Sequence, residues 1–448
     1  MFTKNKAFYK TFLRLCLALM LEQAVVLSVN LADNVMLGRY SEAALSGVAA
    51  VNQIQFVFQQ VVYAIANSMI VLGSQYWGQK RLGEIKKISA IGIRLEILLA
   101  VTLFALVSIF PRGALKIFTN NEAFITQGMA YLKIIRFSYI FFALTAVLLS
   151  TMRVVESVKI ALRVSVLSLL INVSINFLLI EGNFGFPEMG ARGAAIGTLT
   201  ARAIEFTIVL IYVLRDKKLG MRIRDAFSRS GVLMRDFVIV ALPTLGSALL
   251  WSFANVMQTV ILGHMNDSAI AAQSISNTVF LLLKVTSVGA ASAASVIIGK
   301  TVGEGDLKRV KEYARTLQMI FVGIGLTLCC IMLLIRVPLL KVYQAEITPE
   351  TYELANIYML IQSVVLVTMS YQMAVNTGII RGGGDTNFVM YLDIAAVAIF
   401  IPLGCLGGLV WKWSPVLVII CVNLDQVLKC IPAFIRVNRY KWVRKLTR

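Results

Sequence analysis

Long apolar runs recur along the whole chain, and they constrain its fold more than any other feature. A helix that crosses the hydrocarbon core of a bilayer needs about 20 predominantly apolar residues. Only 15% of the 448 residues are charged, whereas a soluble globular protein carries about 25%. The sequence therefore predicts an all-α polytopic membrane protein. Twelve transmembrane helices are expected, over residues 12–37, 44–72, 88–110, 125–150, 164–181, 191–214, 237–262, 269–299, 316–336, 354–380, 389–410 and 415–435.

Positive charge is distributed unevenly between alternate loops. The formal net charge is +20, a value that in a soluble protein would suggest a nucleic-acid partner. Lys and Arg number 31 in the loops on the side of both termini and 6 in the loops on the other side. Cytoplasmic loops of membrane proteins carry such an excess. We therefore expect an even number of spans, cytoplasmic termini, a location in the plasma membrane and no nucleic-acid partner.

The chain also contains an internal repeat. At one constant offset, the first three spans align without a gap with spans seven to nine. The offset that aligns Asn30 with Asn255 also aligns Gly38 with Gly263 and Gly78 with Gly303. Six spans per repeat put both halves into the membrane in the same orientation, as parallel repeats.

The repeat predicts two pseudo-symmetric six-helix lobes around a central cleft. The lobes are expected over residues 1–214 and 237–448, joined by a basic cytoplasmic linker, 215–236. Such halves are typical of alternating access, and a duplication that serves structure alone is the alternative.

A carboxylate lies inside the first span, in "SVNLADNVMLGRYSEAALSG". Asp33 stands five residues before an expected helix end at Gly38. A carboxylate at such depth costs about 2.5–3.5 kcal/mol on insertion scales, so it usually faces a cavity or a partner. Asp33 is therefore a candidate acceptor for a proton or a sodium ion, and the alternative is a structural residue paired with Arg39 or a neighbouring helix. Its repeat mate is Gln258, which places an ion site in the first half.

Amides and a hydroxyl in spans five and six are candidate partners of Asp33. Asn172 and Asn176 are one helical turn apart and share a face. Thr198 lies in the first turns of the next helix, in "GARGAAIGTLT". These side chains offer oxygen ligands, and ordinary hydrogen bonding between closely packed helices is the alternative.

A lysine lies deep in the eighth span, in "NTVFLLLKVTSVGAAS". Lys284 has Gln59 as its repeat mate, so this level is polar in both halves. We expect both residues to face the cleft, and a structural ion pair of Lys284 with an acid such as Asp393 is the alternative. Two spacings predict local ion pairs instead, Asp425 with Lys429 and Arg202 with Glu205.

Other chemistry is poorly supported. The chain has one histidine, His264, and six cysteines in apolar runs, which excludes a multi-histidine metal site and shows no disulfide framework. The glycines of "IIRGGGDTNF" follow no strand and are not followed by Gly-Lys-Ser/Thr, so Arg381 is expected to end a helix. We expect no enzyme activity and no cofactor, with energy supplied by an ion gradient.

Four motifs in order resemble the MATE (multidrug and toxic compound extrusion) transporters, a family of the multidrug/oligosaccharidyl-lipid/polysaccharide flippase superfamily. They are "LADNVMLGRYSEAAL", "GSQYWGQKR", "INVSINFLLIEGNFGFPEMGARGAAIGT" and "GIIRGGGDT". The resemblance implies a V-shaped pair of six-helix bundles that exchanges organic, often cationic compounds for H⁺ or Na⁺. It also implies that Asp33 takes the coupling ion, with Asn172 and Thr198 as polar members of its site.

The chain departs from this family in both halves. Where one branch often has a second aspartate, this chain has Asn176, which leaves the ion and its stoichiometry open. Where another branch has acids in spans seven and ten, Trp251 and Ser370 stand here, so coupling through the second half is not expected. Aromatic, Met and Gln side chains are expected to line a substrate cleft, with plain packing as the alternative: Phe56, Tyr139, Met257 and Gln258.

Three other functions compete with an ion-coupled exporter of small organic molecules. A lipid-linked oligosaccharide flippase of the same superfamily would need a cleft rich in arginine, and often extra helices. An intramembrane enzyme would need clustered acids or histidines. A receptor or scaffold would show no turnover. We expect a monomer that has organic substrates and the lipid bilayer as its partners.

Overall fold

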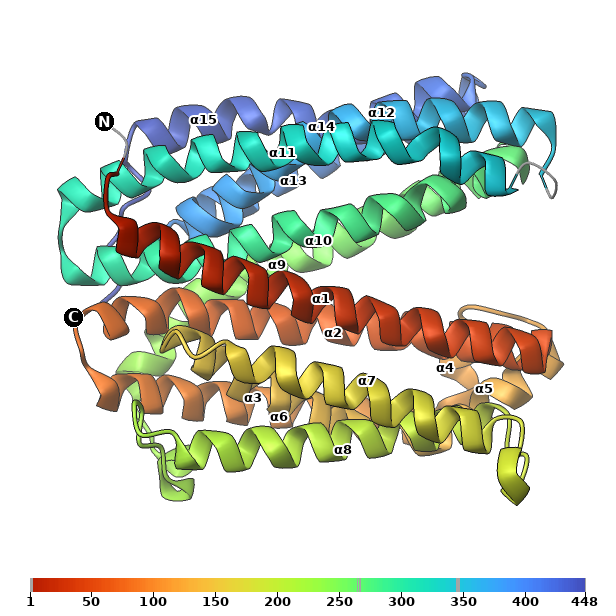
Figure 1. The fold of residues 1–448 in the computed structure, drawn as a ribbon, viewed down its shortest axis with the longest axis horizontal. Helices are drawn as coiled ribbons and strands as arrows, with labels where there is room; N and C mark the ends of the chain where they lie inside the picture. Colours follow the sequence, from red (N-terminus) through yellow and green to blue (C-terminus); the bar gives the residue numbers. More distant parts are fainter. Residues whose placement is uncertain (1–2, 264, 266, 344–346, 448) are drawn as a thin grey trace. The chain divides into compact units, whose positions relative to one another are not determined.

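A computed structural model describes residues 3–263, 265, 267–343 and 347–447, so that His264 lies outside the described residues. Of the described residues, none belongs to a β-strand, which confirms the all-α prediction (Figure 1). The α-helices are α1 (Lys6–Tyr40), α2 (Glu42–Gly78), α3 (Leu82–Ile109), α4 (Pro111–Lys116), α5 (Glu122–Ile135), α6 (Ser138–Val154), α7 (Lys159–Leu179), α8 (Ala191–Arg215), α9 (Gly231–Gly263), α10 (Asp267–Glu304), α11 (Leu307–Tyr343), α12 (Pro349–Met373), α13 (Thr386–Cys405), α14 (Pro415–Leu428) and α15 (Cys430–Asn438). Short 3₁₀ segments are η1 (Asn183–Gly185) and η2 (Ile223–Phe227), and π-helical segments are η3 (Ala374–Arg381) and η4 (Leu406–Val410).

The described helices account for the twelve predicted spans. Eleven are long and apolar enough to cross a membrane, and the pair α5 and α6, bent by 53°, makes a twelfth if it counts as one span. This pair covers the predicted span 125–150. At the bend, Arg136 donates to Ser108 Oγ at 2.9 Å and its guanidinium lies 5.3 Å from the rings of Phe104 and Phe137. These contacts hold the chain where the helix breaks.

Several helices extend further than their apolar runs. The second span was expected over 44–72, and α2 continues to Gly78. Its 37 residues correspond to a length of about 55 Å, more than the roughly 30 Å hydrocarbon core. Hydropathy marks only the part of a helix in contact with lipid, so it underestimates helices that continue into water.

The internal repeat appears in the helix boundaries. The offset from the start of α2 at Glu42 to the start of α10 at Asp267 equals the offset from the start of α3 at Leu82 to the start of α11 at Leu307. It is also the offset that aligns Asn30 with Asn255. The packing repeats as well, since α2 contacts α3, α5 and α6 while α10 contacts α11, α12 and η3. The sequence repeat is therefore a repeat of three-dimensional arrangement.

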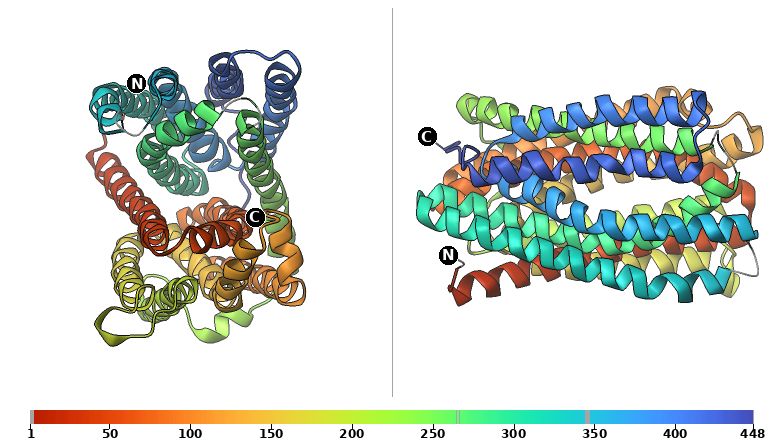
Figure 2. Two further views of the ribbon diagram at one scale, coloured as in Figure 1. Left: turned by 90° about the vertical axis from the view of Figure 1, so that its right-hand side faces the viewer. Right: turned by 90° about the horizontal axis from the view of Figure 1, so that it is seen from above.

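Residue contacts divide the chain into two compact units. The first unit is Leu21–Ala241, and the second unit combines Met1–Met20 with Leu242–Arg448. Within each unit the helices run roughly parallel, as the end-on view in Figure 2 shows. The helices α1 and α9 each contribute to both units. The predicted lobe boundaries, 1–214 and 237–448 with a linker between them, stay a prediction.

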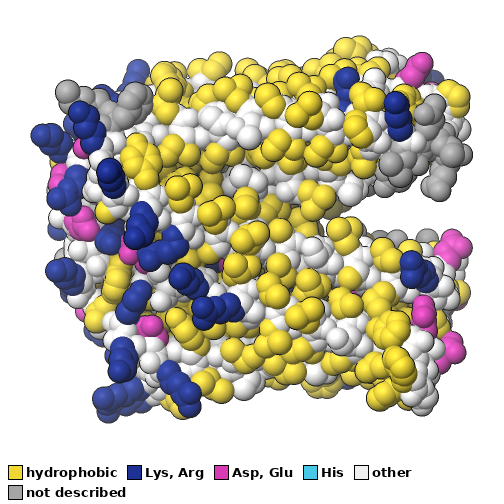
Figure 3. All heavy atoms as spheres, viewed as in Figure 1, with side chains coloured by type: hydrophobic (Ala, Val, Ile, Leu, Met, Phe, Trp, Pro, Cys, Tyr) yellow, Lys and Arg dark blue, Asp and Glu magenta, His cyan; other side chains and the backbone are white. Residues whose placement is uncertain are grey.

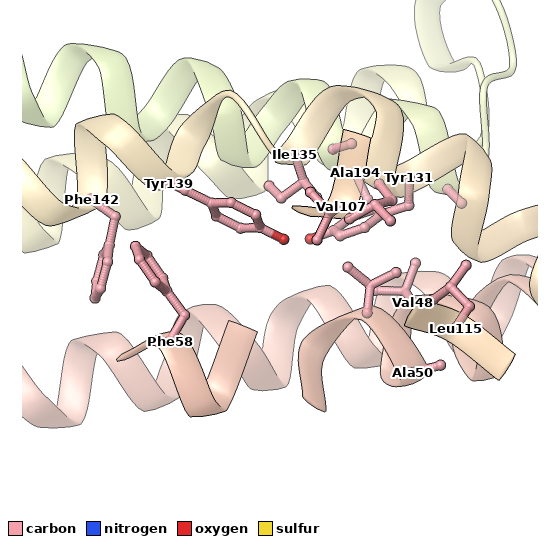
Figure 4. Close-up of a cluster of buried hydrophobic side chains, with 14 of the residues drawn as sticks. Val48, Ala50, Phe58, Val107, Leu115, Tyr131, Ile135, Tyr139, Phe142 and Ala194 are labelled. Carbon is pink, nitrogen blue, oxygen red and sulfur yellow. The ribbon is translucent and has the colours of Figure 1, made fainter. Parts of the chain in front are cut away.

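Each unit has its own apolar core. In the first unit, the ring centroid of Phe58 lies 5.3 Å from that of Tyr139 and 6.1 Å from that of Phe142 (Figure 4). In the second unit, Tyr358 and Met359 belong to a cluster formed by α9 to α12 and α14. On the face shown in Figure 3, apolar side chains cover the flanks of the helices. Such a surface is suited to lipid.

Candidate functional site

Asp33 lies near the end of α1 in the first unit, and its side chain is half-buried. The amide nitrogen of Asn176, in the last turn of α7, donates a hydrogen bond to Asp33 Oδ1 at 2.5 Å. A residue in the first span thus meets one in the fifth, 143 positions along the chain. Asp33 makes no described ion pair with Arg39, but its hydrogen bond with Asn176 on α7 is the contact with a neighbouring helix that the structural alternative expected.

The other two predicted residues extend this contact into a network. Asn176 Nδ2 also donates to Asn172 Oδ1 at 3.2 Å, and Asn172 Nδ2 donates to Thr198 Oγ1 at 3.1 Å. The structure therefore brings together Asp33, Asn172, Asn176 and Thr198 in one connected set. Asn172 and Asn176 share a face of α7, as their spacing predicted. Their role in ion binding stays a prediction.

Close packing of α7 on α8 explains why these groups meet. A side-chain carbon at Gly197 would clash with Asn176 Oδ1, and one at Gly193 would lie 2.5 Å from the carbonyl oxygen of Leu179. Only glycine allows the two backbones to approach this closely at these positions. The small residues of "GARGAAIG" thus place Asn176 at the surface of α8 and leave its amide nitrogen directed to Asp33.

A small cavity adjoins the network within the first unit. Its volume is about 20 Å³, which exceeds the roughly 10–15 Å³ that one water needs. Three valines of α1 line one wall, Val25, Val26 and Val29. The polar side chains that line the cavity come from α7 and α8: Ser168, Asn172, Thr198, Arg202 and Glu205.

An ion pair contributes to the lining of this cavity. Arg202 Nη1 lies 2.7 Å from Glu205 Oε2, which confirms the predicted local pair. Ser168 Oγ donates to the same carboxylate at 3.4 Å, and the guanidinium lies 5.1 Å from the ring centroid of Phe142. Arg202 also interacts electrostatically with Asp33. The cavity is thus bounded by Asn172 and Thr198 of the Asp33 network and by a buried ion pair.

The sequence patterns did not predict a second buried ion pair, that of Arg153 with Glu22. Arg153 Nη2, near the end of α6, lies 2.5 Å from Glu22 Oε1 on α1, and both side chains are largely buried. Glu22 interrupts the first apolar run, which was a signal of a buried role. Its partner lies 131 positions away, so spacing along one helix could not identify it.

A model of the MatE family matches residues 18–178 and 243–406. The chain belongs to the MatE family. The two matched segments lie one in each half of the repeat, as expected for a duplicated fold. Members of the MATE family are transporters rather than enzymes, and the chain is a multi-pass membrane protein.

Individual MATE relatives are distant in sequence. The chain is 25% identical over 378 residues to the "Probable multidrug resistance protein NorM" of Thermotoga maritima, covering 84% of this chain and 80% of that one. It is 20% identical over 428 residues to the "Uncharacterized transporter YisQ" of Bacillus subtilis, covering 95% and 93%. Among solved structures, a mutant of the Vibrio cholerae MATE transporter VcmN matches with a TM-score of 0.88 at 15% identity, covering 98% of both chains. This last match supports the fold.

In this MATE protein, Lys284 lies on α10 of the second unit, and its ammonium is 4.6 Å from the ring centroid of Trp251. The alternative prediction, an ion pair of Lys284 with Asp393, is wrong. Asp393 is held instead by Arg381 at 3.3 Å and by Lys429 at 3.1 Å. Lys429 also lies 3.3 Å from Asp425, which confirms the predicted pair. Arg381 ends η3, as expected of a residue before three glycines.

The remaining predicted substrate residues are spread over three helices. Phe56 and Gln59 lie on α2 and are half-buried, as are Met257 and Gln258 on α9. Tyr139 on α6 is 1% exposed and packs in the core of the first unit, where its hydroxyl points toward that of Tyr131 (Figure 4). For Tyr139, these surroundings match the alternative prediction of plain packing in the core. A substrate role for these residues stays a prediction.

The chemistry available at the Asp33 network depends on which amide atoms face the carboxylate. Asn176 directs its amide nitrogen to Asp33 and its Oδ1 to Gly197, so the Asp33 carboxylate is the candidate group for taking up a proton or a hard cation. Within the described ranges, no group of three or more His, Cys, Asp or Glu side chains could hold a metal ion. The network itself contains one carboxylate, Asp33, and the charged pair Arg202–Glu205 lines the adjoining cavity.

Proposed function

We propose that the chain is a secondary active antiporter that exports organic, often cationic compounds in exchange for H⁺ or Na⁺. The observation that carries the proposal is the Asp33 network: a carboxylate in the first predicted span accepts a hydrogen bond from Asn176, which is linked through Asn172 to Thr198. Membership of the MatE family and the names of relatives such as NorM, a "Probable multidrug resistance protein", support export of drug-like molecules.

The coupling follows from the charge of Asp33. An ion that enters from outside neutralises the carboxylate and removes the penalty for burying it. The neutral site holds a cationic compound less well, and the compound leaves outward. When the ion leaves to the inside, the charged carboxylate again favours the cation. Each ligand then stabilises a different state of the transporter, which is the condition for exchange.

The orientation is part of the proposal. With 31 Lys and Arg on the side of both termini against 6 on the other side, the termini and the basic linker face the cytoplasm of a plasma membrane. Asn176 stands beside Asp33, so the network offers the coupling ion one carboxylate.

The test is ethidium transport by purified protein in liposomes, with a H⁺ gradient and a Na⁺ gradient imposed separately. Wild-type protein transports the dye under one gradient, and Asp33→Asn abolishes that transport because the amide can neither bind a proton nor supply negative charge. The matched control is Asp306→Asn, which keeps full activity. Asp306 precedes α11 and accepts a hydrogen bond from the backbone N–H of Arg309. Full gradient-driven transport by Asp33→Asn would end the proposal. A failure of wild type to move dye under either gradient, together with movement of a lipid-linked oligosaccharide, would favour a flippase.

A further inference from the structure

Lys284 occupies an unusual position for a cation. It lies about 25 Å from the start of α10 at Asp267, at roughly 1.5 Å per residue, so its side chain cannot reach water at either helix end. The side chain is half-buried, and the ammonium lies 4.6 Å from the centroid of the Trp251 ring. One turn along α10, Ser287 Oγ lies 2.7 Å from Ser370 Oγ of α12. The described contact of the ammonium is thus an aromatic ring, and a buried pair of hydroxyls lies one turn further along α10.

Several other cations inside the helices have a carboxylate partner, whereas Arg136 contacts Ser108 and two phenyl rings. The pairs are Arg153 with Glu22, Arg202 with Glu205, Arg381 with Asp393, and Lys429 with both Asp393 and Asp425. For Lys284, no carboxylate of the described residues lies within the 4.0 Å of an ion pair. Asp393, which the sequence offered as a partner, is already bound by two cations. Lys284 therefore differs from these paired cations in lacking an anion among the described residues.

The aromatic ring does not replace that anion. A cation–π contact is worth about 0.5–2 kcal/mol. A lysine at the centre of a membrane span costs about 2.5–3.5 kcal/mol on insertion scales. Part of that cost remains, and a negative group that arrived at Lys284 would offset it. The planar face of Trp251 beside the ammonium would also favour a flat, conjugated ring next to that negative group.

We propose that Lys284 and Trp251 form a binding site in the second unit for substrates that carry a carboxylate beside a planar aromatic ring. The substrate carboxylate pairs with the ammonium, and the ring packs on Trp251. This proposal rests on the proposed transport function and narrows its substrate class, from organic cations in general to compounds that also bear an acidic group.

The test compares a rhodamine with a free carboxylate and its methyl ester, two dyes that share ring and positive charge and differ in one negative charge. Binding is measured in detergent by dye fluorescence, independently of transport. Wild-type protein binds the acid at least about tenfold more tightly than the ester, the scale of one hydrogen-bonded charge. Lys284→Gln removes this preference while ester binding stays unchanged, and Lys284→Arg retains it. Lys308→Gln, a change at an exposed lysine of α11, leaves the preference intact.

Two results would overturn the proposal: equal binding of acid and ester by wild-type protein, or an undiminished preference in Lys284→Gln. Unchanged ester binding by Lys284→Gln shows that the variant is folded. Gradient-driven transport of the ester in liposomes tests the antiport function by itself. A protein that transports the ester but does not discriminate between the dyes has the proposed function without this site. A protein that discriminates without gradient-driven transport has the site without the antiport function.

Discussion

Asn176 Oδ1 lies directly against Gly197, so the side chain that donates to Asp33 is positioned by the absence of a side chain on α8. The amide has no freedom to move toward α8, and its nitrogen is directed to the carboxylate. The geometry of the network therefore depends on Gly197, a residue that has no side chain and takes no part in the hydrogen bonds.

Gly197→Ala should disrupt the site without changing any polar group. The new methyl group clashes with Asn176 Oδ1, so the amide must move and the bond to Asp33 lengthens. We expect gradient-driven dye transport to fall by about tenfold or more, the effect of losing one hydrogen bond to a charged group. Gly83→Ala is the matched control, since nothing lies within 4 Å of a side-chain carbon at that position. Equal transport by both variants would show that Asn176 does not need its present position.

Loss of one member of the Glu22–Arg153 pair should destabilise the protein strongly. Glu22→Gln leaves a buried guanidinium without its counter-charge, at a cost of about 3–5 kcal/mol. The double variant Glu22→Gln/Arg153→Met removes both charges and recovers most of that loss. Thermal unfolding in detergent measures the effect. The control is Glu122→Gln, because the Arg112–Glu122 pair has the same 2.5 Å distance with exposed side chains and should contribute at most about 1 kcal/mol. Similar losses for Glu22→Gln and Glu122→Gln would contradict the importance of burial.

Glu96 on α3 is fully buried, and neither carboxyl oxygen has a hydrogen-bond partner among the described residues. An unsatisfied buried polar group costs about 1–3 kcal/mol. Glu96→Met, which has a similar volume, should therefore raise the unfolding temperature and leave transport unchanged. Glu96→Gln keeps a polar group in the same place and should give no such gain. Lost transport in a stably folded Glu96→Met protein would instead assign the carboxyl a role in the cycle.

The linker after α8 is tied to α3 by charge. Asp225 Oδ2 accepts a hydrogen bond from the backbone N–H of Arg222 at 2.8 Å and lies 3.3 Å from Lys86 Nζ. The N–H, and next Lys86, lower the pKa of Asp225 below its ordinary value of 3.8. Because the folded protein favours the charged form, the stabilisation is present above the ordinary pKa and is lost as the pH falls through the lowered one.

Asp225→Asn should consequently speed amide hydrogen exchange over residues 222–228 at pH 7. The difference in exchange rate between the variant and wild type should shrink below about pH 4, where Asp225 of the unfolded wild-type chain becomes protonated. It should vanish at the lower pH at which Asp225 of the folded wild-type protein is also protonated. Hydrogen exchange followed by mass spectrometry at several pH values measures both effects. A difference that stays constant down to pH 2 would exclude titration of Asp225 as the cause.

The amino-acid sequence by itself determined the membrane class, the repeat and the faces of single helices. Apolar run length, the constant offset between the two halves and the one-turn spacing of Asn172 and Asn176 are local or periodic properties that need no tertiary structure. The same holds for the pairs Arg202–Glu205 and Asp425–Lys429, whose partners lie on one helix.

The tertiary structure alone decided which helices present their polar groups to one another. The rotation of each helix and its contacts depend on packing against neighbouring helices; Gly197 of α8, for example, positions Asn176 of α7. No spacing within one helix encodes this packing. For that reason the pair Glu22–Arg153 was missed and Asp393 was considered as a partner for Lys284, although Arg381 and Lys429 hold it. Spacing identifies the groups on one helix face, and only packing decides which of them meet.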